Sequence, residues 1–113
     1  MPIITVSHKV SATSSDLERL QQELPALVSE ALACPEEPYD SCLRAGDVNL
    51  RFLAALPADE RLDYLVEVRT NWTRSREEDL QERSDRIAAA LATLGLERLG
   101  VWIELAAGAW SQA

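Results

Sequence analysis

The chain has 113 residues, which is enough for one hydrophobic core but too few for two. Its 19 acidic and 11 basic residues give a net charge of −8, which excludes a protein that grips the phosphate backbone of nucleic acids with a basic surface. No apolar run approaches the roughly 20 residues of a membrane-spanning helix, and the first residues lack the pattern of a secretory signal. We therefore expect a soluble, cytoplasmic protein that binds neither nucleic acid nor membranes.

Residues that commonly bind metals are scarce. The only cysteines are Cys34 and Cys42, and the single histidine is His8. A structural zinc site needs about four such ligands, so we expect no metal and no other cofactor. In the cytoplasm both thiols are expected to stay reduced.

The first half of the chain has the pattern strand, helix, strand. The predicted elements are a strand at residues 2–8, a helix at 14–33 and a strand at 48–54. The strands show two-residue alternation, whereas apolar residues recur every three or four positions in the helix. Ser15 and Glu18 have the spacing of a capping box at the helix start. Pro25 has no backbone N–H, so we expect a kink there, or a short turn followed by the main helix.

The second half repeats this order. The predicted elements are a strand at residues 62–69, a helix at 75–95 and a short strand at 101–103. Ser75 and Glu78 again have capping-box spacing, and Gly95 stands where a glycine commonly ends a helix. Arginines among the carboxylates of this helix are interpreted as its solvated face, namely Arg76, Arg83 and Arg86.

Two consecutive βαβ units predict an α/β fold, a four-stranded sheet with two helices on one face. We expect a single domain over residues 1–113, with units at 2–56 and 62–105 and a C-terminal contact segment at 106–113. The opposite sheet face would lack a cover, and on so small a chain the simplest cover is another copy of itself. An oligomer is therefore predicted from the pattern alone.

Four segments carry a resemblance to a known family. They are PIITV at residues 2–6, ELPAL at 23–27, TRSRE at 73–77 and VWIE at 101–104. In this order and spacing they resemble the tautomerase superfamily, which includes 4-oxalocrotonate tautomerase, 5-carboxymethyl-2-hydroxymuconate isomerase, macrophage migration inhibitory factor, malonate semialdehyde decarboxylase and the cis-3-chloroacrylic acid dehalogenases. The resemblance covers nearly the whole chain. It implies a homotrimer whose sheets face inward, with pockets at the subunit boundaries.

The resemblance implies that Pro2 is the catalytic residue once Met1 has been removed. Desolvation and nearby positive charge lower the pKa of a secondary amine, which can then accept a proton from carbon beside a carbonyl. The plain alternative is that proline simply follows the initiator, as it does in many proteins. If Met1 stays attached, the nitrogen of Pro2 is an amide without basicity, and a non-catalytic oligomeric binding protein becomes the better interpretation.

Arginines are the expected ligands of a small carboxylate substrate, because the guanidinium group binds carboxylates with two parallel hydrogen bonds. Arg74 matches the arginine of the family's Arg-Ser segment. Arg44 aligns approximately with an arginine ahead of the second strand in the carboxymethyl-hydroxymuconate isomerases. Arg69 is a candidate by its position near the end of the third strand. For Arg44 and Arg69 a solvated surface position is an equal alternative.

Trp102 and Glu104 complete the predicted site. By the resemblance, Trp102 replaces a pocket tyrosine and Glu104 replaces an asparagine of the inhibitory factor. A carboxylate at position 104 would order water or raise the pKa of Pro2. The first hypothesis is a tautomerase or isomerase acting on a small unsaturated or 2-keto carboxylic acid. The alternative is a decarboxylase or hydratase/dehalogenase on the same scaffold, for which the loop acids Glu36, Glu37 and Asp40 are open candidates.

Overall fold

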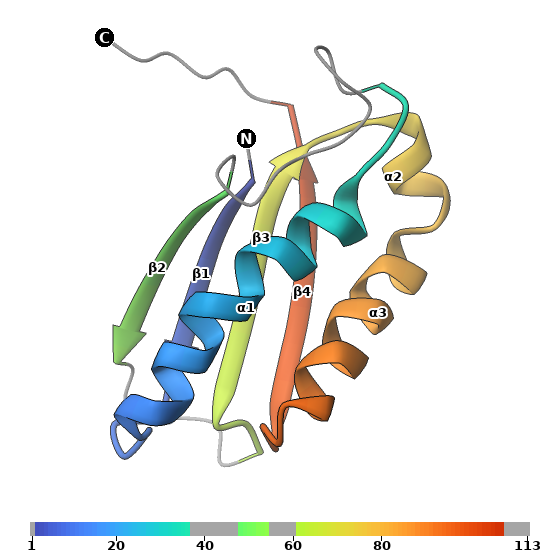
Figure 1. The fold of residues 1–113 in the computed structure, drawn as a ribbon. Coiled ribbons are helices and arrows are strands. Elements are labelled where there is room, and N and C mark those ends of the chain that lie inside the picture. Colours follow the sequence, from blue (N-terminus) through green and yellow to red (C-terminus); the bar gives the residue numbers. More distant parts are fainter. Residues whose placement is uncertain (1, 37–47, 55–60, 108–113) are drawn as a thin grey trace, which may run out of the picture.

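The computed structural model describes residues 2–36, 48–54 and 61–107. Its elements, in chain order, are β1 (Ile3–His8), α1 (Ser14–Leu32), β2 (Asn49–Ala54), β3 (Tyr64–Asn71), α2 (Arg74–Glu78), α3 (Leu80–Thr93) and β4 (Leu99–Ala106) (Figure 1). The predicted order of strands and helices is confirmed, and the last strand is longer than the three residues expected. In these parts of the chain no helix has the length and apolar character needed to cross a membrane.

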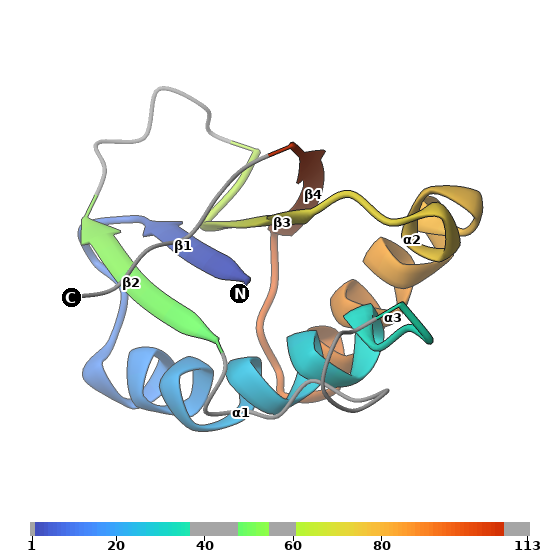
Figure 2. The same cartoon turned by 90° about the horizontal axis from the view of Figure 1, so that it is seen from above.

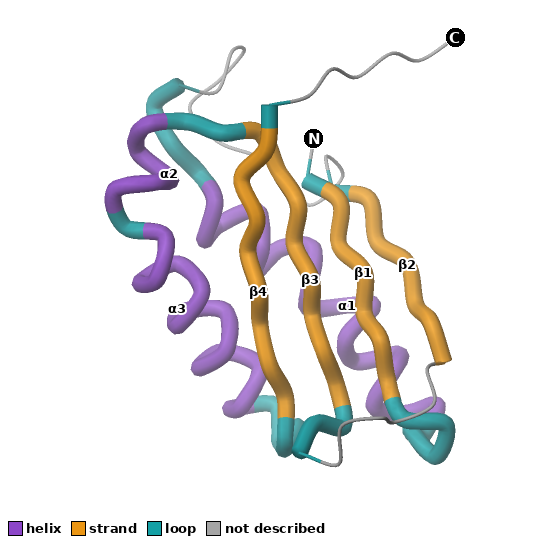
Figure 3. Tube along the Cα trace, turned by 180° about the vertical axis from the view of Figure 1, so that it is seen from behind, coloured by secondary structure: helices purple, strands orange, loops and turns teal. Residues whose placement is uncertain are grey.

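The four strands form one mixed sheet in the order β2-β1-β3-β4. β1 pairs with β2 in parallel and with β3 antiparallel, and β3 pairs with β4 in parallel. α1 and α3 lie on one face of this sheet, and α2 lies beyond the outer edge of β4, as the view from above shows (Figure 2); the other face is open (Figure 3). This is the predicted arrangement of two βαβ units, joined through the antiparallel β1–β3 pair.

The two helix starts differ from the prediction. The first helix is capped by Thr13 and the second by Thr73, and each hydroxyl accepts the backbone N–H three residues on, at 3.2 Å. The predicted capping boxes at Ser15 and Ser75 are therefore wrong. In both cases the threonine stands two residues before the serine, so the helix starts earlier and the serine lies within its first turn.

The positions at which the helices are interrupted also differ from the prediction. Pro25 lies inside α1, which continues without a break from Ser14 to Leu32, and the hydroxyl of Ser29 donates to the Pro25 carbonyl at 2.7 Å. The second predicted helix is instead divided at Asp79, whose φ of −130° and ψ of 34° are not helical. Gly95 follows α3 with φ of 83°, a conformation that glycine adopts without strain, so its predicted role at the helix end is confirmed.

The core lies between the helices and the covered face of the sheet. Its fully buried apolar side chains are Ile4, Val6, Leu20, Leu24, Val28, Leu32, Val66, Val68, Ile87 and Leu91. Burial of one such side chain stabilises the fold by about 1.5–3 kcal/mol relative to exposure. β1 and β3 are the central strands, and their inward side chains belong to the same core as those of α1 and α3. The alternate residues of these two strands therefore point to the open face.

Two arginines of the second helix region are buried, contrary to the prediction of a solvated face. Arg76 is 2% exposed and Arg83 is 7% exposed, whereas Arg86 is exposed as predicted. The Nε of Arg76 donates to the carbonyl of Leu32 at 3.0 Å, and Nη1 of Arg83 donates to that of Ala31 at 3.0 Å. These carbonyls end α1, where a helix leaves acceptors unpaired and its dipole favours positive charge.

Candidate active site

The open face of the sheet is crossed by two rows of side chains. Cα pairing places Asn49, Ile3, Arg69 and Glu104 in one row and Arg51, Thr5, Glu67 and Trp102 in the next. Each row takes one residue from each strand, because side chains alternate between faces. Three predicted site residues, Arg69, Trp102 and Glu104, thus come together from β3 and β4.

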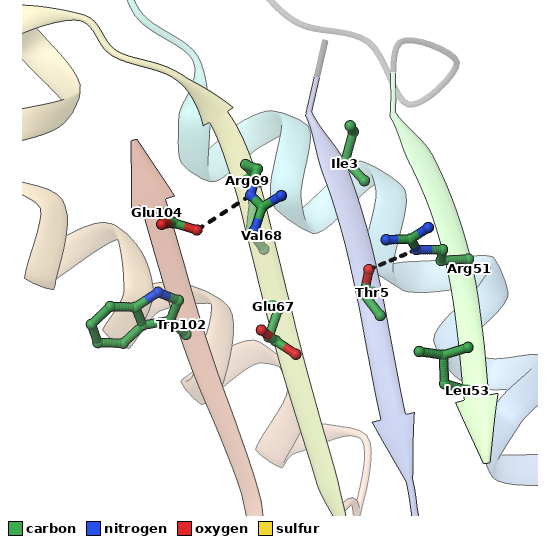
Figure 4. A pocket seen from close by; sticks show the side chains of 9 residues that line it. All are labelled: Ile3, Thr5, Arg51, Leu53, Glu67, Val68, Arg69, Trp102 and Glu104. Carbon is green, nitrogen blue, oxygen red and sulfur yellow. Dashed lines mark hydrogen bonds and ion pairs between the residues drawn. The ribbon is translucent and has the colours of Figure 1, made fainter. Parts of the chain in front are cut away.

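These rows surround a shallow cavity of about 240 Å³. Its lining residues, shown in Figure 4, are Ile3, Thr5, Arg51, Leu53, Glu67, Val68, Arg69, Trp102 and Glu104. All four strands contribute, so the cavity depends on the strand order and not on one loop. It combines two cations, two carboxylates and an aromatic ring on one surface.

One ion pair in the cavity joins Arg69 to Glu104. The Nε of Arg69 donates to the Glu104 carboxylate at 3.2 Å, across the β3–β4 pair (Figure 4). Among the described residues, the two terminal nitrogens of Arg69 have no hydrogen-bond partner. They are therefore free to bind a carboxylate, while Glu104 fixes the plane of the guanidinium.

Trp102 forms the apolar side of the cavity and is 62% exposed. The same residue borders a second hollow of about 410 Å³ at the outer edge of β4. That hollow is lined by Leu80, Gln81, Ser84, Val101, Trp102 and Ile103. Its wall is fixed by Ser84, whose hydroxyl donates to the Val101 carbonyl at 3.1 Å. Trp102 is thus a large apolar surface that this subunit leaves uncovered.

Pro2 lies at the start of β1, one residue before the row that holds Arg69. Its ring is fully buried, and its carbonyl accepts the N–H of Asn49 at 2.9 Å. The neighbouring Ile3 pairs directly with Arg69. Pro2 does not itself line the cavity, but it directly precedes Ile3, which does.

Arg74 is not brought into the cavity. It begins α2, its side chain is 83% exposed, and its Nε pairs with Glu78 at 3.3 Å. The α2 helix follows β3 and lies at the same end of the strands as the N-terminus (Figure 1). Arg44, together with Glu37 and Asp40, lies outside the described residues.

Glu36 is the one loop acid among these candidates that the structure describes. Its carboxylate accepts from the hydroxyl of Ser75 at 2.6 Å and from the Ser75 backbone N–H at 2.9 Å. The bond from the hydroxyl, followed by that from the backbone, lowers the pKa of Glu36 from its ordinary value of 4.5. Glu36 therefore ties the end of the α1 region to the start of α2.

Arg51 and Glu67 line the cavity but were not predicted as site residues. A signal was present in the sequence, because both alternate with inward apolar residues in the strands predicted at 48–54 and 62–69. The alternation predicts on which sheet face a residue lies, but it does not predict which residues of other strands lie beside it. Only the strand order β2-β1-β3-β4 brings the two residues onto one row.

Comparison with known proteins identifies the fold. No protein-family model matches the sequence, and no curated protein is significantly similar to it. Among solved structures, malonate semialdehyde decarboxylase is similar over 98% of this chain and 90% of its own, with a TM-score of 0.67 and 14% identity. A macrophage migration inhibitory factor-like protein from Entamoeba histolytica matches over 92% and 85%, with a TM-score of 0.60 and 11% identity.

A fused 4-OT in a symmetric trimer matches over 92% of this chain and 85% of its own, with a TM-score of 0.60 and 15% identity. These proteins share one architecture, and the chain has the fold of the tautomerase superfamily. The resemblance expected from the four sequence segments is thus confirmed at the level of the fold. Enzymes are among these structural neighbours.

Proposed function

We propose that the chain, after removal of Met1, is a tautomerase that moves a proton in a small unsaturated or 2-keto carboxylic acid. The observation that carries this proposal is the sheet register, in which Ile3, Arg69 and Glu104 form one row directly after Pro2. A secondary amine just before β1 would then stand one residue from the row that holds Arg69. That pair of groups can hold a carboxylate and move a proton beside it.

Pro2 acts as the general base in this proposal. Its ring is fully buried, and burial disfavours the protonated form of an amine. The nearby positive charge of Arg69 acts in the same direction, whereas Glu104 opposes it. A lowered pKa would leave the amine neutral near pH 7, as a base that removes a proton from carbon must be.

The proposed substrate is held by Arg69 through its two terminal nitrogens, which also stabilise the enolate that forms. Trp102 supplies an apolar wall and Glu104 orients the arginine. Arg74 and Arg44 remain proposed substrate ligands, although Arg74 lies outside the cavity of its own chain and Arg44 lies outside the described residues. No metal or other cofactor is needed for this chemistry.

We further propose that the protein is a homo-oligomer, with a trimer as the expected state, and that it works in the cytoplasm as a single domain. The open sheet face needs a cover, and the fused 4-OT to which the chain is similar is a symmetric trimer. The residues at 106–113, of which 108–113 lie outside the described residues, are proposed as a contact segment between copies.

A second candidate function is decarboxylation or hydration on the same scaffold. Glu104 favours it, because a carboxylate in the cavity can order a water molecule for addition to an unsaturated acid. Decarboxylase and hydratase activities are described for the malonate semialdehyde decarboxylase to which the chain is similar. Asparagine keeps a side-chain oxygen that can accept from Arg69 but cannot take a proton from water, so Glu104→Asn should impair a hydratase far more than a tautomerase.

The proposal is tested first by intact-mass measurement of untagged protein. A mass lacking one methionine residue means that the Pro2 amine is free, and assays of enol and 2-keto acids follow. Pro2→Ala should then lower kcat/KM by about 10²–10⁴-fold, the contribution of a general base. Arg86→Ala, on the exposed side of α3, is the matched control and should leave the rate unchanged.

Two results would contradict the proposal. Full activity in Pro2→Ala would remove the proline base. Retention of Met1 under gentle expression would make the nitrogen an amide, and a non-catalytic oligomeric binding protein would then be the better description.

A further inference from the structure

The charges on the open sheet face balance, although the whole chain is strongly acidic. Among the described residues this face carries two arginines and two glutamates, namely Arg51, Arg69, Glu67 and Glu104. The chain has a net charge of −8, so the entire excess of negative charge lies elsewhere. Two copies approaching through this face would therefore avoid the repulsion that opposes contact through other surfaces.

Among the described residues, only two of these four charges are paired with each other. Arg69 binds Glu104 at 3.2 Å. Arg51 donates from Nε to the Thr5 hydroxyl at 2.9 Å, and its terminal nitrogens have no partner among the described residues (Figure 4). Glu67 has no hydrogen bond or ion pair to any described residue. One unpaired cation and one unpaired anion thus stand two strands apart on the same row.

The face also has the properties of a surface that is covered in the assembled protein. Leu53 and Trp102 are 51% and 62% exposed on it. Any cover over these apolar groups would also take Arg51 and Glu67 out of water, which is unfavourable unless each meets an opposite charge.

We propose that a second copy of this chain covers the open face and that Arg51 of one copy forms an ion pair with Glu67 of the next. The second copy is the occupant that brings both missing charges, because it presents the same unpaired anion and cation. This inference rests on the proposed oligomer and adds to it the pair of residues that sets the register between copies.

Charge reversal tests the pair. Arg51→Glu would place two carboxylates together, and Glu67→Arg would place two guanidinium groups together, so each should raise the dissociation constant of the oligomer at least about 100-fold. The double variant restores an opposite pair in reversed order and should return to within about 10-fold of wild type. Sedimentation equilibrium over a range of protein concentrations measures all of these values.

Arg86→Glu is the matched control, because it makes the same change in net charge as Arg51→Glu but on the helix side, where Glu82 is the one described residue with which Arg86 pairs. Its dissociation constant should equal that of wild type. Arg51→Gln and Glu67→Gln keep the side chains polar without repulsion, and each should weaken assembly less than the matching reversal. Circular dichroism checks that every variant is folded.

The outcomes separate this inference from the proposed function. An oligomer whose mass is unchanged by either reversal, or a double variant no better than the single ones, would overturn the Arg51–Glu67 pair alone. A wild-type chain that stays monomeric at all concentrations would overturn the oligomer and this pair together. Full activity of Pro2→Ala would overturn the chemistry and leave the pair standing.

Discussion

The buried side chain of Arg83 gives the sharpest stability prediction. Its Nη1 donates to the carbonyls of Ala31 at 3.0 Å and Ala33 at 2.9 Å, and its Nε donates to Asp79 at 2.6 Å. Arg83→Met keeps the apolar stem but removes every donor. Two carbonyls at the end of α1 would then lose their partners in a largely buried position.

The magnitude follows from the kinds of bond that are lost. A hydrogen bond from a charged donor contributes about 1.5–3 kcal/mol, so the two carbonyl bonds together contribute about 3–6 kcal/mol. The pair with the partly exposed Asp79 adds less than about 1 kcal/mol. We expect Arg83→Met to lower the free energy of unfolding by about 3–6 kcal/mol and Tm by roughly 10–25 °C.

Urea unfolding followed by circular dichroism measures this loss, with the protomer concentration held constant because assembly contributes to apparent stability. Arg86→Met is the control, since Arg86 forms only an exposed pair with Glu82 at 3.6 Å and should lose less than about 0.5 kcal/mol. An Arg83→Met protein within 1 kcal/mol of wild type would refute the role given to this side chain.

Two further predictions concern the ends of the helices. The folded pKa of Glu36 lies below its unfolded value, so the carboxylate contributes stability above pH 4.5 that is lost as the pH falls through the folded pKa. Thermal melts between about pH 3 and pH 6 measure this loss, and Glu36→Gln should remove the part of the acid dependence that Glu36 causes. A pH profile that is the same in the variant and the wild type would contradict this. Gly95→Ala places a side chain at a residue with φ of 83°, and the nearest atom to the new Cβ is 3.9 Å away, so there is no steric clash. Backbone strain alone should therefore lower the free energy of unfolding by about 1 kcal/mol, as measured by urea unfolding. No measurable loss would argue against this backbone conformation.

Much of the fold follows from local pattern. Two-residue alternation and the three- to four-residue recurrence of leucine identify the strands and helices, and Gly95 marks the end of α3 as expected. The helix starts were misplaced because Thr13 and Ser15 are both good caps, two residues apart. The division of the second helix at Asp79 was missed, since the sequence there has an uninterrupted helical pattern.

The errors about Arg76 and Arg83 have a different origin. Arginines among carboxylates on a helix have the pattern of a solvated face. The acceptors that bury them are carbonyls of α1, which lie 44 and 52 residues away in the sequence. No local pattern reports such a pairing. The same reason explains why Arg69 and Glu104 could be proposed singly, whereas their contact and the Arg51–Glu67 row required the sheet order.

The buried arginines also bear on how the site is completed. Arg76 and Arg83 fasten the start of α2 and α3 to the end of α1, and this holds α2 beyond the outer edge of β4 (Figure 2). Arg74 is consequently fixed in solvent, away from the cavity of its own subunit. If Arg74 binds substrate as proposed, the substrate must extend to that edge or be held by an adjacent copy. The second condition requires that the copy on the open face bring its own Arg74 to the cavity, and assembly and catalysis would then depend on the same surface.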